Sequence, residues 1–383
     1  MSKKKKQETN TSDLQKDIPS LNSIYFYLTE GCNCKCRHCW ITPKYEVGGK
    51  GKWPYLALTE FKKIVKQGLK LGLQSVKLTG GEPLIHPDIL EILAYIEKTN
   101  LRLIVETNGL ACTPEIAAAI KRCTNPFVSI SLDGANPETH NWVRGVDNAY
   151  KQAIDGVYNL VQVGIHPQLI MSLVKRNKDQ MERLVYIAGR IGAGSVKFNM
   201  VAPIMDRGTQ LAEDNETLTI EEFIEIGNKI EHELQPKTNL SLYYSFPFAF
   251  RSLSALFDEG SLGSCGIFGI IGVLGSSKYA LCGIGESVPE LIFGDVKKDK
   301  LADIWNNNDL LQQIREGLPS KLEGICGDCL MKKMCMGECI ANNYFVNKNL
   351  FAPYWFCAQA HKEKLFPKSR IVPGSKSDKE LAS

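Results

Sequence analysis

TEGCNCKCRHCW, at Thr29–Trp40, is the most informative stretch of this chain. It holds Cys32, Cys36 and Cys39 in a C-x3-C-x2-C spacing, so one loop can wrap three thiolates around a metal or a cluster. A 4Fe–4S cluster held by only three cysteines keeps one iron open for a further ligand. The loop therefore predicts an iron–sulfur cluster that binds another molecule.

The same loop has two simpler interpretations, a structural zinc site and a disulfide. Zinc usually takes four ligands, and His38 is a poor fourth because it lies directly beside Cys39. Cys34 breaks the spacing, so we do not count it as a ligand. The sequence on either side of the loop decides between these interpretations.

Predicted strands flank the loop on both sides. SIYFYLT at Ser23–Thr29 is rich in aromatic and β-branched residues, and SVKLTGGEP at Ser75–Pro83 is a strand that ends in a glycine turn. A strand, a cysteine loop, a helix, a strand and GGEP in this order resemble the radical S-adenosylmethionine (SAM) superfamily. The resemblance covers residues 20–210.

This resemblance implies both a chemistry and a set of binding residues. The open iron would bind the amine and carboxylate of SAM, and one electron would split SAM into methionine and a 5′-deoxyadenosyl radical that abstracts hydrogen from C–H bonds. The protein would orient and shield this cofactor. Glycines let the backbone approach closely, and Glu82 would accept from the methionyl amine. The residues expected to bind SAM are Gly80, Gly81, Glu82, Pro83, Asn108, Ser131, Asp133, Arg144 and His38.

The remaining residues of this set have roles that the resemblance also implies. Arg144 would hold the SAM carboxylate, because its fork matches a carboxylate bidentately. Ser131 and Asp133 would hydrogen-bond the ribose or the SAM backbone, His38 would lie near the adenine, and Asn108 would support the site from behind. The alternatives are a capped strand-to-helix turn at GGEP and purely structural roles for the others.

From Ser23 onward, the pattern alternates between strands and helices and predicts an α/β fold. Six such units make a partial (β/α)6 TIM-like barrel, whose chemistry lies at the C-terminal ends of the strands. Each motif above follows a predicted strand. We expect strands at 23–29, 74–79, 101–107, 126–132, 168–174 and 195–200, and helices at 57–71, 87–98, 114–122, 148–163 and 179–191.

The composition excludes several classes of protein. The chain has 383 residues, of which 44% are hydrophobic, and its net charge of +4 is too small to indicate nucleic acid binding. The start, MSKKKKQETNTSD, lacks the apolar core of a signal peptide, and no run of 18 apolar residues predicts a membrane span. The thirteen cysteines therefore indicate reduced thiols that hold clusters in an anaerobic cytoplasm.

Seven of the thirteen cysteines lie between Cys265 and Cys357. Their spacing, and FGDVKKDKLADIWNN at Phe293–Asn307, resemble the SPASM domain, a C-terminal extension of many radical SAM enzymes that holds two auxiliary clusters. A zinc ribbon is the alternative. The resemblance implies an inner cluster on Cys265, Cys282 and Cys339 and a distal cluster on Cys326, Cys329, Cys335 and Cys357.

The chain departs from the SPASM pattern in two places. It has no further cysteine between Cys265 and Cys282 to give the inner cluster a fourth ligand, and Ser277 stands where the family has a glycine. We therefore expect an inner cluster with an open iron or a ligand other than cysteine.

The segments outside these motifs complete the predicted organisation. Leu218–Leu234 has the apolar spacing of a helix, with Thr219 as its N-cap and Glu222 three residues further on. The predicted divisions are a disordered tail at 1–19, the barrel at 20–210, a bridging helical region at 211–264, the SPASM domain at 265–366 and a second disordered tail at 367–383.

SPASM-containing radical SAM enzymes mostly act on peptides or proteins, so we expect maturation of a ribosomally made peptide, for example by crosslink formation. The alternatives are a sulfatase-type maturase that forms formylglycine, a small-molecule dehydrogenase, and a non-enzymatic iron–sulfur electron carrier. The expected partners are the peptide and a low-potential donor of the flavodoxin or ferredoxin type. Strand one begins too early for a winged leader-binding module, so any leader would be recognised by a separate leader-binding protein or by the barrel surface. The substrate and the bond formed are not encoded in these motifs.

Overall fold

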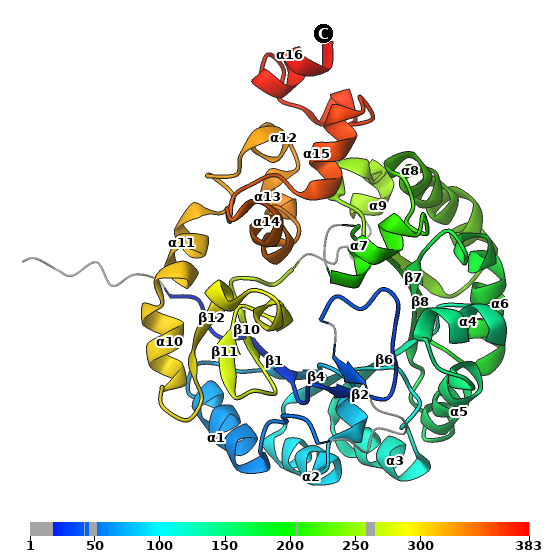
Figure 1. Ribbon diagram of the computed structural model, residues 1–383, viewed down its shortest axis with the longest axis vertical. Helices are drawn as coiled ribbons and strands as arrows, with labels where there is room; N and C mark the ends of the chain where they lie inside the picture. The colour runs from blue at the N-terminus through cyan, green and yellow to red at the C-terminus, as the bar shows by residue number, and fades with distance from the viewer. Residues whose placement is uncertain (1–17, 42, 46–51, 204–205, 258–264, 383) are drawn as a thin grey trace, which may run out of the picture.

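One continuous ten-stranded sheet curves around the middle of the molecule in the computed structural model (Figure 1). The structure describes residues 18–41, 43–45, 52–203, 206–257 and 265–382, so the predicted N-terminal tail lies almost wholly outside the described residues. The strand order is β12-β11-β10-β1-β4-β5-β6-β7-β8-β9. The strands are β1 Ser23–Tyr27, β4 Ser75–Thr79, β5 Arg102–Thr107, β6 Thr124–Ser131, β7 Gln168–Leu173, β8 Ser195–Met200, β9 Ser241–Tyr244, β10 Ile270–Val273, β11 Lys278–Ala280 and β12 Ile292–Asp295.

The six predicted barrel strands, β1 and β4 to β8, are confirmed with ends within two residues of those expected. Each pairs in parallel with the next. The sheet is longer than predicted at both edges. β9, from the region predicted as a helical bridge, pairs in parallel with β8, and β10, from the C-terminal domain, pairs in parallel with β1. The cysteine-rich domain therefore continues the barrel sheet through the hairpin β10-β11.

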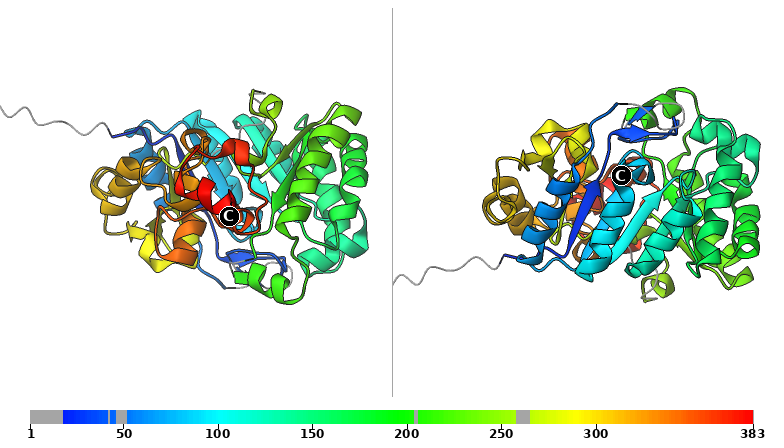
Figure 2. Two further views of the ribbon diagram at one scale, coloured as in Figure 1. Left: turned by 90° about the horizontal axis from the view of Figure 1, so that it is seen from above. Right: turned by 90° about the horizontal axis from the view of Figure 1, so that it is seen from below.

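Helices cover the outer face of this sheet, as predicted, and Figure 2 shows α1 to α3 in front of the strands when the molecule is seen from below. Their apolar stripes face inward; α6, for example, buries Met181, Leu184 and Ala188. No helix within the described segments is long and apolar enough to cross a bilayer. The barrel helices are α1 Leu58–Leu69, α2 Ile89–Thr99, α3 Pro114–Arg122, α4 Pro137–Arg144, α5 Ala149–Gln162 and α6 Met181–Ile191.

The predicted helix of the bridging region is confirmed as α8, Ile220–Lys229, continued by a π-helical turn to Leu234. Thr219 and Glu222 form the expected capping box. The other elements are short: β2 Gly31–Cys32, β3 Lys44–Tyr45, α7 Asp206–Glu213, α9 Leu253–Phe257, α10 Leu301–Asn307, α11 Asp309–Gly317, α12 Gly324–Gly327, α13 Lys332–Cys335, α14 Ile340–Asn347, α15 Trp355–Lys362 and α16 Lys376–Ala382.

The expectation of a disordered tail from residue 367 is wrong. This segment forms a 3-10 turn at Lys368–Arg370, and Ile371 pairs with Cys329 in an isolated β-bridge. It then ends in α16, where the amide of Ser377 donates to Asp328 Oδ2 at 3.0 Å. The polar composition of this segment predicted disorder. The segment is ordered because hydrogen bonds to the cysteine-rich domain, rather than a long apolar stripe, hold it in place.

The pairing of β1 with β10 joins the two domains, so the buried residues of β1 should contribute to the stability of the fold. Ile24 of β1 is fully buried, with Ile271 of β10 and Val76 of β4 as its register partners. Ile24→Ala removes buried apolar volume, so we expect it to lower the free energy of unfolding by about 2–5 kcal/mol, measured by urea denaturation. Leu253→Ala, at a residue 58% exposed, is the matched control and should have little effect. Equal losses in the two variants would contradict this account of the core.

Candidate active site

The glycine turn after β4 packs directly against the cysteine loop. The amide of Gly81 donates to Thr29 O and that of Glu82 to Gly31 O, both at 2.9 Å. A side chain on Gly81 would begin 1.9 Å from Gly31 O, so only glycine permits this approach. Gly80 has a φ of +119°, which glycine also favours. The two sequence motifs are thus joined by backbone hydrogen bonds.

The other side of the loop is held by the end of helix α4. The amides of Lys35 and Arg37 donate to the carbonyls of Arg144 and Val143, both at 2.9 Å. These carbonyls belong to the last turn of the helix, where no intrahelical partner exists. Gly145 ends the helix with a φ of +68°, and a Cβ there would lie 2.3 Å from Lys35 O. Helix α4 thereby fixes the path of the cysteine loop.

These contacts enclose a cavity of about 460 Å³ at the C-terminal ends of the barrel strands. Cys32, Cys36 and Cys39 line it together. So do seven of the residues expected to bind SAM: Gly80, Gly81, Glu82, Asn108, Ser131, Arg144 and His38. The other two, Pro83 and Asp133, are buried and are not among the described residues that line the cavity.

The carboxylate of Glu82, at the cavity wall, accepts three hydrogen bonds. Its Oε1 accepts from Thr107 Oγ1 at 2.6 Å and from the amide of Leu84 at 3.0 Å, and its Oε2 accepts from the amide of Asn108 at 2.8 Å. Burial nevertheless raises the pKa of Glu82 to about 7, because desolvation outweighs these bonds. The carboxylate is therefore fixed in position and sensitive to an incoming positive charge.

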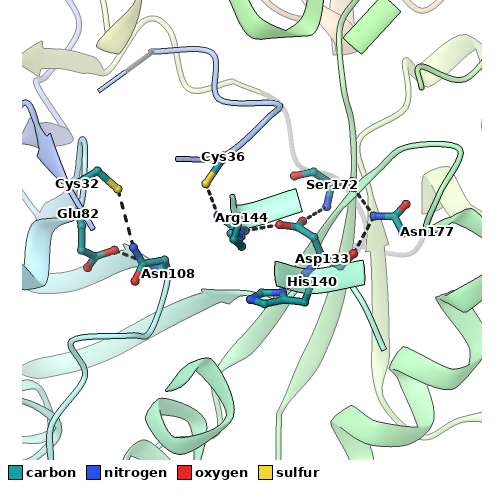
Figure 3. Close-up of polar contacts among 9 residues, drawn as sticks. All are labelled: Cys32, Cys36, Glu82, Asn108, Asp133, His140, Arg144, Ser172 and Asn177. Atoms are coloured by element: carbon teal, nitrogen blue, oxygen red, sulfur yellow. Dashed lines mark hydrogen bonds and ion pairs between the residues drawn. The ribbon is translucent and has the colours of Figure 1, made fainter. Parts of the chain in front are cut away.

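Arg144 links the cysteine loop to the barrel wall (Figure 3). Its Nη2 lies 2.5 Å from Asp133 Oδ2, and its Nη1 donates to Cys36 Sγ at 3.4 Å. Both charged residues are buried. The buried Nε of Arg144 has no hydrogen-bond partner among the described residues. Because Arg144 lines the cavity, the positive charge of its guanidinium suits an anionic ligand such as a carboxylate.

Asn108 and His38 also have environments that bear on their expected roles. Asn108 Nδ2 donates to Asn33 Oδ1 at 2.7 Å and lies 3.9 Å from Cys32 Sγ, so this residue contacts the cysteine loop, and its expected supporting role stays a prediction. His38 lines the cavity, and its buried Nδ1 has no partner in the described part of the chain. Its expected position near the adenine remains a prediction.

No sequence motif indicated the residues that surround Asp133. The amide of Ser172 donates to Asp133 Oδ1 at 2.7 Å, and Asn177 Nδ2 donates to Asp133 O at 2.9 Å. His140 Nδ1 accepts from the Asp133 amide at 3.0 Å. Ser172 lies in β7 and Asn177 follows that strand, whereas Asp133 follows β6, so only the fold brings them together. Cys34 is buried beside Cys32 and Cys36 and is not among the described residues that line the cavity.

Two of the three cysteines expected at the inner auxiliary cluster, Cys282 and Cys339, line the same cavity as the loop cysteines. Burial raises the pKa of the Cys282 thiol to about 12, and the nearby thiols of Cys339 and Cys265 add to the shift. Gly272 of β10 permits this arrangement, because a Cβ there would lie 2.8 Å from the Cα of Cys282. The three expected ligands are therefore neighbours beside the cavity.

The four cysteines expected at the distal cluster surround a separate, smaller cavity lined mostly by apolar residues. The amides of Tyr354 and Met331 donate to Cys326 Sγ and Cys329 Sγ, both at 3.3 Å. Backbone donors to sulfur are among the features that tune iron–sulfur clusters. The structure thus brings Cys357 to Cys326, Cys329 and Cys335 despite their separation in the sequence.

Ser277, where the SPASM pattern has a glycine, keeps a backbone that glycine favours. Its φ is +62°, and it lies in the tight turn between β10 and β11. Its Oγ donates to Glu60 Oε2 of α1 at 2.8 Å. This departure therefore leaves the turn intact and adds a contact to the barrel.

The donor sets fit the expected cofactors. Within the described segments, no three His, Cys, Asp or Glu side chains converge as the ligands of one metal ion would. The loop cysteines are instead spread around a cavity that has room for a larger group, and thiolates are the usual ligands of 4Fe–4S clusters. Glu82 and Arg144, on the same wall, offer opposite charges to the amine and carboxylate of SAM.

Comparison with known proteins agrees with this geometry. The model of the radical SAM superfamily matches residues 26–185, and that of SPASM, an iron–sulfur cluster-binding domain, matches residues 265–330. An AdoMet-dependent heme synthase from Methanosarcina barkeri is 28% identical over 328 residues, which cover 84% of this chain and 91% of that protein. The mycofactocin maturase MftC from Mycobacterium tuberculosis is 25% identical over 359 residues, which cover 92% of this chain and 86% of the relative.

Among solved structures, SuiB from Streptococcus suis bound to its precursor peptide SuiA superposes with a TM-score of 0.70. The match covers 89% of this chain and 76% of that chain, at 17% identity. At this identity the likeness concerns the fold, and it agrees with a barrel followed by a cysteine-rich domain.

The raised pKa of Glu82 predicts how SAM binding depends on pH. Glu82 loses its charge as the pH falls through about 7, and only the charged form attracts an ammonium group. We expect SAM affinity to weaken between about pH 8 and about pH 6. Glu82→Gln should bind SAM roughly ten- to a hundredfold more weakly at the higher pH and lose this pH dependence.

Isothermal titration of SAM into the reconstituted protein measures both effects, with iron content as the folding control. Glu91→Gln, on the outer helix α2, is the matched control and should keep the affinity and pH dependence of the wild type. A pH dependence that persisted in Glu82→Gln would remove Glu82 from the site.

Proposed function

We propose that this chain, which belongs to the radical SAM superfamily and carries a C-terminal SPASM domain, modifies a peptide by radical chemistry. One observation carries the proposal. A single cavity is lined both by Cys32, Cys36 and Cys39 and by Cys282 and Cys339. A substrate in this cavity lies between the group that starts radical chemistry and a second iron–sulfur site.

The bound cofactors supply a 5′-deoxyadenosyl radical, generated from SAM by one electron from a 4Fe–4S cluster. The chain's own residues bind and orient. Cys32, Cys36 and Cys39 hold the cluster, while Glu82 and Arg144 hold the two ends of the methionine group by charge-assisted hydrogen bonds. The backbone contacts of Gly81 and Gly145 fix the loop that presents the cysteines. Seven further cysteines hold the two auxiliary clusters.

A peptide substrate is supported by the relatives. The mycofactocin maturase aligns with 92% of this chain, including both the barrel and the cysteine-rich domain. The fold likeness to SuiB is to a structure bound to its precursor peptide. A small-molecule substrate is the second candidate, because the heme synthase has the higher identity, 28%. Formylglycine formation remains an alternative form of protein modification.

The same proposal implies partners and a location. One electron must reach the first cluster for each SAM cleaved, so a low-potential carrier of the flavodoxin or ferredoxin type supplies it. A separate protein recognises the leader of the peptide. Clusters held by many reduced thiols would favour an anaerobic cytoplasm as the location of the enzyme.

Coexpression with candidate peptides tests the substrate class. Short reading frames beside the gene supply the candidates, and mass spectrometry of each purified peptide should show a change that appears only with the wild-type enzyme. The control enzyme is Cys32→Ala/Cys36→Ala/Cys39→Ala. Turnover of a porphyrin precursor, with every neighbouring peptide unchanged, would favour the small-molecule alternative instead.

The cysteine assignments predict the iron content. Three 4Fe–4S clusters give about twelve irons per chain, and the triple alanine variant of Cys32, Cys36 and Cys39 should hold about eight. This variant should not convert SAM to 5′-deoxyadenosine with dithionite, because it lacks the first cluster. Iron and sulfide analysis and chromatography of the products are the measurements. Cleavage of SAM by the variant would overturn the central assignment, whereas no cleavage by the wild type would favour an electron carrier.

A further inference from the structure

Both oxygens of the Asp133 carboxylate contact groups of the protein, and the residue is not among the described residues that line the cavity. Oδ1 is bonded to the amide of Ser172, Oδ2 is paired with Arg144, and the residue is fully buried. It lies behind the cavity wall rather than on it. Asp133 can therefore influence a bound group only through Arg144.

The ion pair between Asp133 and Arg144 is expected to contribute little to the stability of the fold. Burying two charges carries a large desolvation cost, and apolar replacements of buried pairs are often neutral or stabilising. What this pair provides is a guanidinium with a fixed orientation. Asp133 is itself held by His140 and Asn177 through its backbone, so it forms a rigid support (Figure 3).

The supported guanidinium reaches a cluster ligand. Arg144 Nη1 lies 3.4 Å from Cys36 Sγ, and the backbone of Arg144 also binds the loop through Lys35. Net charge and hydrogen bonds to sulfur both set the reduction potential of an iron–sulfur cluster. A positive donor on a ligating sulfur favours the reduced cluster, which carries one more negative charge. The carboxylate of Asp133 offsets part of that positive charge.

We propose that Asp133 is a positioning residue which, through Arg144, sets the reduction potential of the cluster held by Cys32, Cys36 and Cys39. The proposal rests on the proposed function in requiring that cluster. It assigns opposite effects to the two members of the pair. Arg144 raises the potential of the cluster, and Asp133 limits the increase.

The test measures the reduction potential of this cluster by EPR of samples poised without SAM. Its signal is identified as the one that changes when SAM is added to a parallel sample. Arg144→Met removes the positive donor, so the potential should shift downward. Asp133→Asn keeps the shape but removes the compensating charge, so the potential should shift upward. Arg144→Lys keeps the charge and should lie closer to the wild type than Arg144→Met.

An exposed ion pair on the outer helices provides matched controls. Arg122 Nε lies 3.3 Å from Glu97 Oε2, and Arg122→Met and Glu97→Gln should leave the potential unchanged. Shifts of the same sign in Arg144→Met and Asp133→Asn, or no shift in either, would overturn the proposal. If Asp133→Asn does not bind the cluster, the test depends on the two Arg144 variants. Equal reduction potentials in Arg144→Met and Arg144→Lys would then reject the proposal. A wild type without a SAM-responsive cluster would instead contradict the proposed function.

Discussion

The site depends on backbone hydrogen bonds that hold one loop between two rigid supports. The glycine turn after β4 binds the start of the cysteine loop at Thr29 and Gly31, and the last carbonyls of α4 bind its middle at Lys35 and Arg37. Both supports use groups that their own elements leave unpaired, since a strand end and a helix C-terminus each have free backbone partners. Three cysteine side chains can then line one cavity without a long stretch of regular structure.

Charged side chains also hold the cysteine loop in position. Arg144 contributes its carbonyl to Lys35 and its guanidinium to Cys36 and Asp133, so one residue joins the loop, the helix and the barrel wall. Asp133 in turn is fixed from β7 by the amide of Ser172. A displacement of β7 would therefore reach the cysteine loop through only two side chains. Substitutions at this pair act on position and electrostatics together.

Much of this arrangement could be predicted from the sequence, because local patterns determine it. Apolar periodicity located the barrel strands and their outer helices, and the cysteine and GGEP motifs located part of the cavity wall. Helix α4 was missed because PETHNWVR is short and has little apolar spacing. The position of Asp133 behind Arg144, and the pairing of β10 with β1, depend on contacts between distant segments that no local pattern records. The ordered C-terminus was missed for the same reason.

The inward faces of the barrel strands show why the interior is a cavity rather than a core. Strands buried on both faces usually read as continuous apolar runs. Here the outward residues of β4 are Val76 and Leu78, fully buried, while the inward positions are Lys77 and Thr79, and both line the cavity.

On the neighbouring strand β5, Glu106 pairs with Lys77 at 2.6 Å and also lines the cavity. Such charges would be costly in a packed core, but they are tolerated around a space that holds solvent or ligand. The glycine turn, Cys282 and Cys339 line the same cavity as these charged residues. The alternation of polar and apolar residues in these strands therefore explains why the barrel encloses a cavity for the chemistry rather than a packed core.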